Sequence, residues 1–83
     1  MEKTIYTREY EIVLRLLKEA RETAGITQVQ LAKKLKQSQS FVSKIERGDR
    51  RIDIVQLRTI CKIIGTTLME FVSRLEKELG TFK

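Results

Sequence analysis

Apolar residues recur along the chain at spacings of three and four positions, and no segment alternates strictly between apolar and polar residues. This is the period of an α-helix with one buried face, so the pattern predicts helices throughout and an all-α fold. Proline is absent. Glycines follow the periodic segments, where left-handed C-terminal caps are expected: Gly25, Gly48, Gly65 and Gly80.

Residues that favour helix N-caps divide this pattern into five helices. Each has a side-chain oxygen that can accept a backbone N–H of the first turn. These residues are Thr7, Thr27, Ser38, Asp53 and Thr67. Gln30 and Glu70 lie three positions after their threonines and fit capping boxes. The expected helices cover about residues 8–24, 27–35, 39–47, 54–64 and 68–79.

The apolar side of each helix supplies the expected core. In the 8–24 helix, the buried arc would contain Tyr10, Val13, Leu14, Leu17, Ala20 and Ala24, with Ile12 and Leu16 beside it. In the next two helices, the buried residues would be Val29, Leu31, Ala32, Leu35, Val42 and Ile45. Because the connections are short, we expect one domain over residues 1–83, with its core in about 8–79.

The residue types that the chain lacks exclude several kinds of site. There is no histidine, so imidazole-based catalysis and imidazole metal ligands are impossible. The single cysteine, Cys61, stands in an apolar stretch and is expected in the core rather than in a zinc site. No apolar run reaches the roughly 18 residues that cross a bilayer, and no signal peptide is apparent. We therefore expect a cytoplasmic protein without a cofactor, a metal or an enzymatic activity.

Positive charge is concentrated in one part of the sequence. The chain has a net charge of +6, and residues 33–51 contain seven basic and two acidic residues, which leaves only +1 for the remainder. A basic segment in an otherwise balanced chain is typical of a phosphate-binding surface. A solvated face of lysines and arginines is the alternative interpretation.

The two helices expected at 27–35 and 39–47 are short and are separated by about three residues. This spacing is typical of a helix-turn-helix, in which the second helix enters the major groove of DNA. Ala32 would lie where the two helix axes cross, since a larger side chain there would force them apart. A helical hairpin that does not bind DNA would bury similar residues and remains the structural alternative.

Two segments resemble the Cro/phage-repressor helix-turn-helix family, often called XRE: TQVQLAKKL at 27–35 and SQSFVSKIERG at 38–48. The resemblance covers about residues 10–72 and implies a five-helix lambda-repressor-like fold that binds double-stranded DNA. It also implies a structural ion pair between Arg21 and Glu46. The family often has glycine where Lys36 stands, an apolar residue in place of Gln37, and proline in place of Ile52.

Base contacts are expected from the N-terminal part of the 39–47 helix. The amide of Gln39 can donate and accept together on adenine N6 and N7. Ser40 and Ser43 have short hydroxyls that can reach bases or phosphates, and Lys44 can reach guanine O6 and N7 or a phosphate. The family resemblance implies base contacts at Gln39, Ser40 and Lys44, with Ser43 nearby. Solvated polar residues on an exposed helix face are the alternative.

Phosphate contacts are expected at both ends of the motif. Gln28 begins the first helix, where free backbone N–H groups favour an anion. Arg47, Arg50 and Arg51 flank the other end, and the resemblance supports Arg47 in particular. Ser38 is a candidate phosphate ligand as well as a helix cap.

The helix expected at about 68–79 has a long apolar stripe: Leu68, Phe71, Val72, Leu75 and Leu79. This stripe predicts a two-fold homodimer that places two recognition helices about 34 Å apart on a palindromic operator. The alternative is that the helix closes the core of the monomer.

The function that follows is sequence-specific regulation of transcription, with repression as the expected direction. Restriction-modification controllers and antitoxins are possible subtypes of such a small regulator. The alternative function is a helical protein–protein interaction module without DNA binding.

Overall fold

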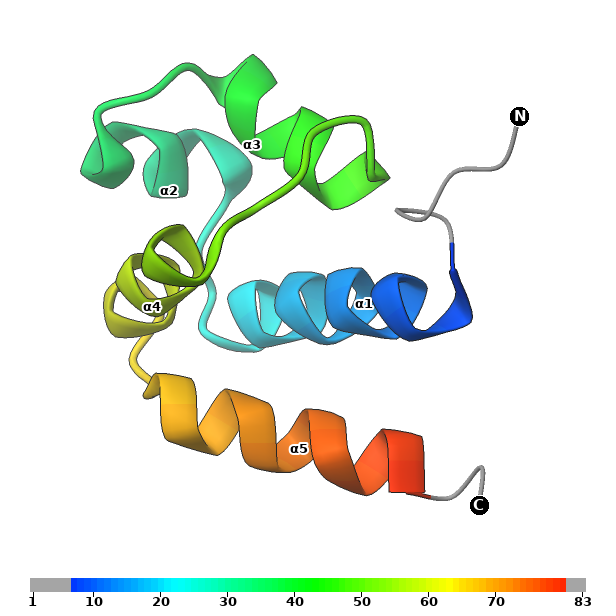
Figure 1. Ribbon diagram of the computed structural model, residues 1–83. Coiled ribbons are helices and arrows are strands. Elements are labelled where there is room, and N and C mark those ends of the chain that lie inside the picture. The colour runs from blue at the N-terminus through cyan, green and yellow to red at the C-terminus, as the bar shows by residue number, and fades with distance from the viewer. Residues whose placement is uncertain (1–6, 81–83) are drawn as a thin grey trace.

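The computed structural model describes residues 7–80, which form five α-helices and no strand (Figure 1). The helices are α1 (Arg8–Thr23), α2 (Gln28–Leu35), α3 (Gln39–Arg47), α4 (Ile54–Ile63) and α5 (Leu68–Gly80). The predicted all-α class is confirmed, and each observed boundary lies within one residue of its prediction. No helix in this part of the chain has both the length and the apolar character that spanning a bilayer requires.

Local capping chemistry explains where the helices begin. Thr7, Thr27, Ser38 and Asp53 each accept the backbone N–H of the residue three positions later. The predicted capping box at Thr27 is closed by Gln30. The one predicted at Thr67 is not closed, because the carboxylate of Glu70 accepts the Thr66 hydroxyl at 2.8 Å instead. The Thr67 hydroxyl still accepts the Glu70 backbone N–H at 3.0 Å.

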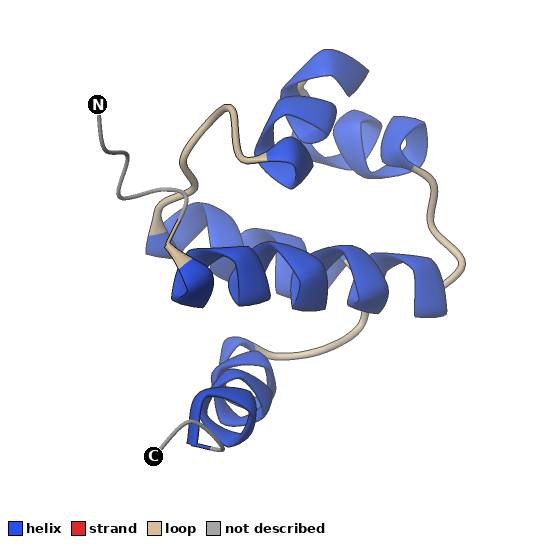
Figure 2. Cartoon of the chain, turned by 90° about the vertical axis from the view of Figure 1, so that its right-hand side faces the viewer, coloured by secondary structure: helices blue, strands red, loops and turns tan. Residues whose placement is uncertain are grey.

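The helices are arranged in three layers. α2 and α3 form one outer layer, α1 and α4 lie in the middle, and α5 covers the other side (Figures 1 and 2). Accordingly, α1 contacts both α3 and α5, and α4 contacts both α2 and α5. The basic helix-turn-helix is thereby separated from α5 by the thickness of one helix layer.

The core lies between these layers and receives side chains from all five helices. Its most buried members include Leu16 of α1, Leu31 of α2, Ile45 of α3, Cys61 of α4 and Phe71 of α5. Cys61 is buried as predicted, and its burial raises the pKa of the thiol, which therefore stays protonated.

Three predictions about buried faces were wrong. Ile12 and Leu16 belong to the core rather than to the edge of the α1 arc, because α1 is covered on two sides by α3 and α5. Ala24 is exposed at the C-terminal end of α1. Val29 is 54% exposed, because α2 directs Leu31 and Ala32, not Val29, into the core.

Lys36 occupies the turn between α2 and α3 in the left-handed conformation, with φ 60° and ψ 41°. A side chain in this region costs about 1 kcal/mol relative to glycine. The predicted left-handed glycines are present at Gly25, Gly48 and Gly65. Gly80 differs, since it lies inside the end of α5 rather than in a cap.

Candidate nucleic-acid interface

α2 and α3 pack against each other more extensively than any other pair of helices. Leu31 and Ala32 of α2 meet Val42 and Ile45 of α3 in the buried core. Ala32, expected at the crossing of the two helices, is 2% exposed within this core. The motif predicted over residues 27–47 is therefore a rigid unit whose outer face carries the polar residues of α3.

A chain of hydrogen bonds runs from the interior to the start of α3. Arg21 Nε donates to Glu46 Oε2 at 2.7 Å, and Arg21 Nη2 donates to Glu46 Oε1 at 3.2 Å. Gln28 Nε2 donates to Glu46 Oε1 at 2.9 Å, and Gln39 Nε2 donates to Gln28 Oε1 at 2.7 Å. Four side chains from α1, α2 and α3 are thus linked in series.

The inner end of this chain is the ion pair expected between Arg21 and Glu46. Its side chains are 8% and 5% exposed. Arg21 Nη1 also donates to the carbonyl oxygen of Ile26 at 2.7 Å, which ties the α1–α2 connection to the same group. A buried ion pair of this kind holds position well because each charge has several hydrogen-bond partners.

At the outer end of this hydrogen-bond chain, the bond to Gln28 determines which polar atoms of Gln39 are available to a ligand. Because Gln28 donates to Glu46, its carbonyl oxygen faces Gln39 and can accept only from the Gln39 amide nitrogen. One N–H and the carbonyl oxygen of Gln39 stay available at the exposed start of α3. This is the donor–acceptor pair that adenine N7 and N6 require.

The other predicted base-reading residues lie on the same helix. Ser40 and Lys44 are exposed. Ser43 is half-buried, and its hydroxyl accepts Arg47 Nη1 at 3.1 Å. Ser38 is the N-cap of α3 and accepts the backbone N–H of Phe41 at 3.1 Å, so its oxygen has a structural role.

The predicted phosphate-binding arginines are each held by a neighbour. Arg47 Nε donates to Asp49 at 3.0 Å. The guanidinium of Arg50 lies 4.7 Å from the centre of the Phe41 ring, and that of Arg51 lies 5.6 Å from the centre of the Tyr10 ring. Sequence reasoning did not identify Phe41 and Tyr10 as partners of these arginines.

A polar hollow with a volume of about 260 Å³ lies beside α3. Its lining residues are Gln37, Ser38, Ser40, Phe41, Lys44 and Arg50. The structure therefore brings four predicted DNA-contacting residues to one concavity. Gln28 and Gln39 lie together through their own hydrogen bond, and Arg51 is directed towards α1.

The residues predicted for a dimer interface are only partly available on α5. Phe71 is 3% exposed and belongs to the monomer core, so its assignment to an interface was wrong. Leu75 and Leu79 pack against the same core and are half-buried, as is Leu68. Val72 is 38% exposed, and Met69, which is not among the residues of the predicted stripe, is 81% exposed.

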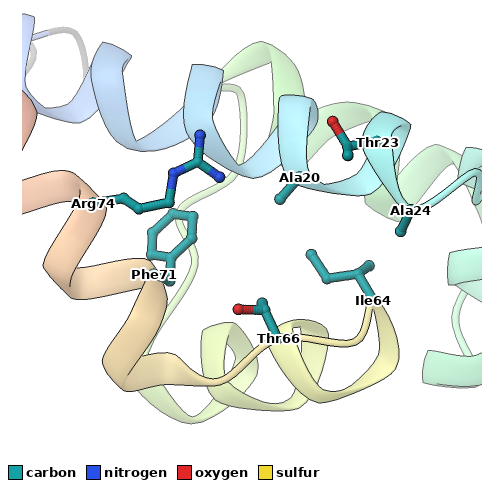
Figure 3. Close-up of a pocket in the computed structure, with 7 residues that line it drawn as sticks. All are labelled: Ala20, Thr23, Ala24, Ile64, Thr66, Phe71 and Arg74. Carbon is teal, nitrogen blue, oxygen red and sulfur yellow. The ribbon is translucent and has the colours of Figure 1, made fainter.

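A pocket of about 200 Å³ lies between α1, α4 and α5 (Figure 3). Its walls combine Ala20, Ile64 and Phe71 with the side chain of Arg74. None of the residues predicted to contact DNA lines this pocket. The candidate interface is therefore the exposed face of α3 with its flanking turns.

Comparison with known proteins agrees with this geometry. Residues 17–71 match the family model HTH_3, described as helix-turn-helix. The chain belongs to the XRE-type helix-turn-helix family. It is 33% identical over 64 residues to control protein C.MunI from a Mycoplasma species. The aligned residues cover 77% of this chain and 86% of C.MunI.

Two solved structures are similar. An XRE-family like protein from Pseudomonas syringae is 45% identical, with a TM-score of 0.83 over 90% of this chain and 92% of that one. The clp gene regulator ClgR from Corynebacterium glutamicum is 20% identical, with a TM-score of 0.77 over 90% of this chain and 80% of that one. It shares the fold. The fold is lambda-repressor-like, and the protein is a DNA-binding transcriptional regulator.

Proposed function

We propose that this regulator binds duplex DNA sequence-specifically through α3, with Gln39 as its principal base-reading residue. The hydrogen-bond chain from Arg21 to Gln39 supports this proposal most strongly. It presents an oriented donor and acceptor at the N-terminal end of the recognition helix, where side chains reach base edges. Gln39 selects adenine by pairing with N7 and N6 in the major groove.

The other contacts follow from position and charge. Ser40, Ser43 and Lys44 lie along α3 and complete the base-reading face. Gln28 binds a phosphate through its backbone N–H at the start of α2. Ser38, at the start of α3, binds a phosphate as well.

Arg47 at the end of α3, and Arg50 and Arg51 in the turn that follows it, bind further phosphates. Their contacts supply affinity for any sequence, because every duplex presents the same backbone charges.

The test is the selection of bound sites from a random duplex library with the purified protein. We expect enrichment of one sequence with an adenine in each half-site. Recovery of the input composition after several rounds would exclude sequence-specific binding.

We further propose that the protein acts as a homodimeric repressor on a palindromic operator. The support is the exposed apolar surface on α5, which centres on Met69 and Val72 and continues to Leu68. Large exposed apolar side chains that lie close together favour association. Leu75 and Leu79 contribute the edges of this surface.

Sedimentation as a function of concentration tests the dimer. Met69→Glu should shift the protein to a monomer, whereas Val55→Glu, a matched change of an exposed apolar residue on α4, should leave the dimer intact. A monomer mass at all concentrations of the parent protein argues against the dimer. Dissociation by Val55→Glu alone would move the interface to α4.

The similarity to a protein named as a control protein supports the controller subtype over the antitoxin subtype. A transcription assay on the selected site, with and without the protein, tests the direction of regulation. Repression is the expected result, and stimulation would overturn it.

A further inference from the structure

Two consecutive arginines in the α3–α4 turn are each placed over an aromatic ring. Phe41 of α3 lies under Arg50, and Tyr10 of α1 lies under Arg51. The two rings come from different helices, so neighbouring residues of one turn are held by separate parts of the fold. Both guanidinium–ring distances, 4.7 Å and 5.6 Å, are within the range of cation–π attraction.

The Phe41 ring is itself fixed. It is half-buried, packs against the core, and lines an apolar groove with Leu35, Val55 and Ile60. A flexible surface arginine that stacks on a fixed ring loses much of its rotational freedom before any ligand arrives. Phe41 therefore restrains Arg50 in the free protein.

Stacking has a different effect on an arginine from pairing with an acid. Arg47 uses two of its five N–H donors, on Nε and Nη1, for Asp49 and Ser43, and the carboxylate beside it repels an approaching phosphate. The guanidinium of Arg50 makes no hydrogen bond or ion pair with another residue of the described range 7–80, although the backbone N–H of Arg50 donates to the Lys44 carbonyl. A stacked guanidinium keeps its in-plane N–H donors available.

The surroundings of Arg50 favour an anion. The polar hollow beside α3 is lined by two cations, Lys44 and Arg50, and by the hydroxyl-bearing Ser38 and Ser40. None of its six lining residues is acidic. A phosphodiester group that enters this hollow would meet both positive charges.

We propose that Phe41 is a positioning residue that holds Arg50 in place to bind a backbone phosphate of DNA in this hollow. Tyr10 positions Arg51 in the same way for a second phosphate. The inference rests on the proposed function and adds two residues to it, neither of which needs to touch DNA.

A double-mutant cycle tests this role, with Kd measured by fluorescence anisotropy on the selected duplex and on an unrelated one. Phe41→Leu retains an apolar side chain but removes the ring, and should weaken binding to both duplexes about 2- to 5-fold. In an Arg50→Ala background, the same change should have no further effect. Phe41→Tyr, which keeps a ring, should restore parental affinity.

Circular dichroism and thermal unfolding of each variant show whether Phe41→Leu is folded. Arg50→Lys gives a second route if it is not, because it leaves Phe41 untouched, keeps the charge and removes the planar group. We expect Arg50→Lys also to weaken both duplexes about 2- to 5-fold.

The outcomes separate this inference from the proposed function. If Phe41→Leu binds both duplexes with parental affinity, the positioning role is overturned and the proposed function stands. The same holds if Phe41→Leu weakens binding by the same factor in the parent and in the Arg50→Ala background. Parental affinity in Arg50→Lys also overturns the positioning role. Failure of the parent protein to bind any duplex overturns the proposed function as well.

The Tyr10–Arg51 pair provides an internal comparison. Its distance is longer, so the loss on Tyr10→Leu should be smaller than that on Phe41→Leu and should vanish in an Arg51→Ala background. A loss that persists without Arg51 would show that Tyr10 acts through the packing of α1 instead.

Discussion

Gln39 at the start of α3 and the two arginines of the turn after α3 are held in place by different means. At the start of α3, Gln39 is connected through Gln28 to a buried ion pair by bonds of 2.7–2.9 Å. Arg50 and Arg51, from the turn that follows α3, are exposed and lie over aromatic rings, those of Phe41 in the first turn of α3 and of Tyr10 in α1. Gln39 is fixed by directional hydrogen bonds, and Arg50 and Arg51 by non-directional attraction to the rings.

This difference matches the roles proposed above, base reading for Gln39 and phosphate binding for the arginines. Reading a base requires a donor and an acceptor with defined orientation, since a wrong amide orientation would select a different base edge. Binding a phosphate requires charge in the right region, and many approach directions are acceptable.

The largest effect, a loss of stability, should come from Glu46→Ala at the buried end of the hydrogen-bond chain. Arg21 would be left as a buried charge without its carboxylate partner, so the free energy of unfolding should fall by about 3–5 kcal/mol. Urea unfolding measures this loss. Glu46→Gln, which keeps one acceptor, should lose less. Glu19→Ala, which removes an exposed partner of Arg15, should change the free energy of unfolding little. Equal losses of stability in Glu46→Ala and Glu19→Ala would contradict a special role for the buried pair.

Gln39→Ala should have the next largest effect, and on binding rather than on folding. The selected duplex should lose about 1–3 kcal/mol of binding free energy, because one bidentate base contact disappears. Binding to unrelated duplexes should stay unchanged. Competition binding with duplexes that carry each base at the adenine position would measure the relaxed preference. An equal loss on every sequence would instead identify Gln39 as a phosphate contact.

Arg47→Ala should weaken binding to all sequences by the same factor. The slope of log affinity against log salt concentration should decrease by about one charge, because one phosphate contact is lost. Arg74→Ala, on α5 in the layer furthest from α3, is the matched control and should leave both quantities unchanged. A loss confined to the selected duplex would show that Arg47 reads a base.

Asp49→Asn should produce the smallest change and the opposite sign. The carboxylate of Asp49 pairs with Arg47 in the free protein, and its removal frees this guanidinium for a phosphate. An exposed ion pair of this type contributes at most about 1 kcal/mol, so affinity for all duplexes should rise about 2- to 5-fold. Glu76→Gln on α5 controls for the change in net charge. Weaker binding in Asp49→Asn would mean that Asp49 positions Arg47 productively.

Local features of the fold could be predicted from the sequence. Helix starts follow from capping side chains such as Thr7 and Ser38, whose hydrogen bonds involve only the next few residues. The ion pair between Arg21 and Glu46 was expected from the family resemblance and is present in the structure. The roles of individual residues in DNA binding remain predictions.

Features that depend on packing between layers were less predictable. Periodicity identifies apolar positions on α5 but not which of them face the core, so the predicted interface includes the buried Phe71 and omits the exposed Met69. The bond between Gln28 and Gln39 depends on how α2 crosses α3. The ring under Arg51 comes from Tyr10, 41 positions away in the sequence, and no local pattern indicates that contact.

The most direct test of base reading by Gln39 is the replacement of a single ring nitrogen of the DNA by a C–H group. In the selected duplex, the adenine assigned to Gln39 is replaced by 7-deazaadenine, which lacks the N7 acceptor. The account predicts that the parent protein binds this duplex more weakly, while Gln39→Ala binds both duplexes equally. A parent protein whose affinity is unchanged by this substitution at every adenine of the site would contradict it.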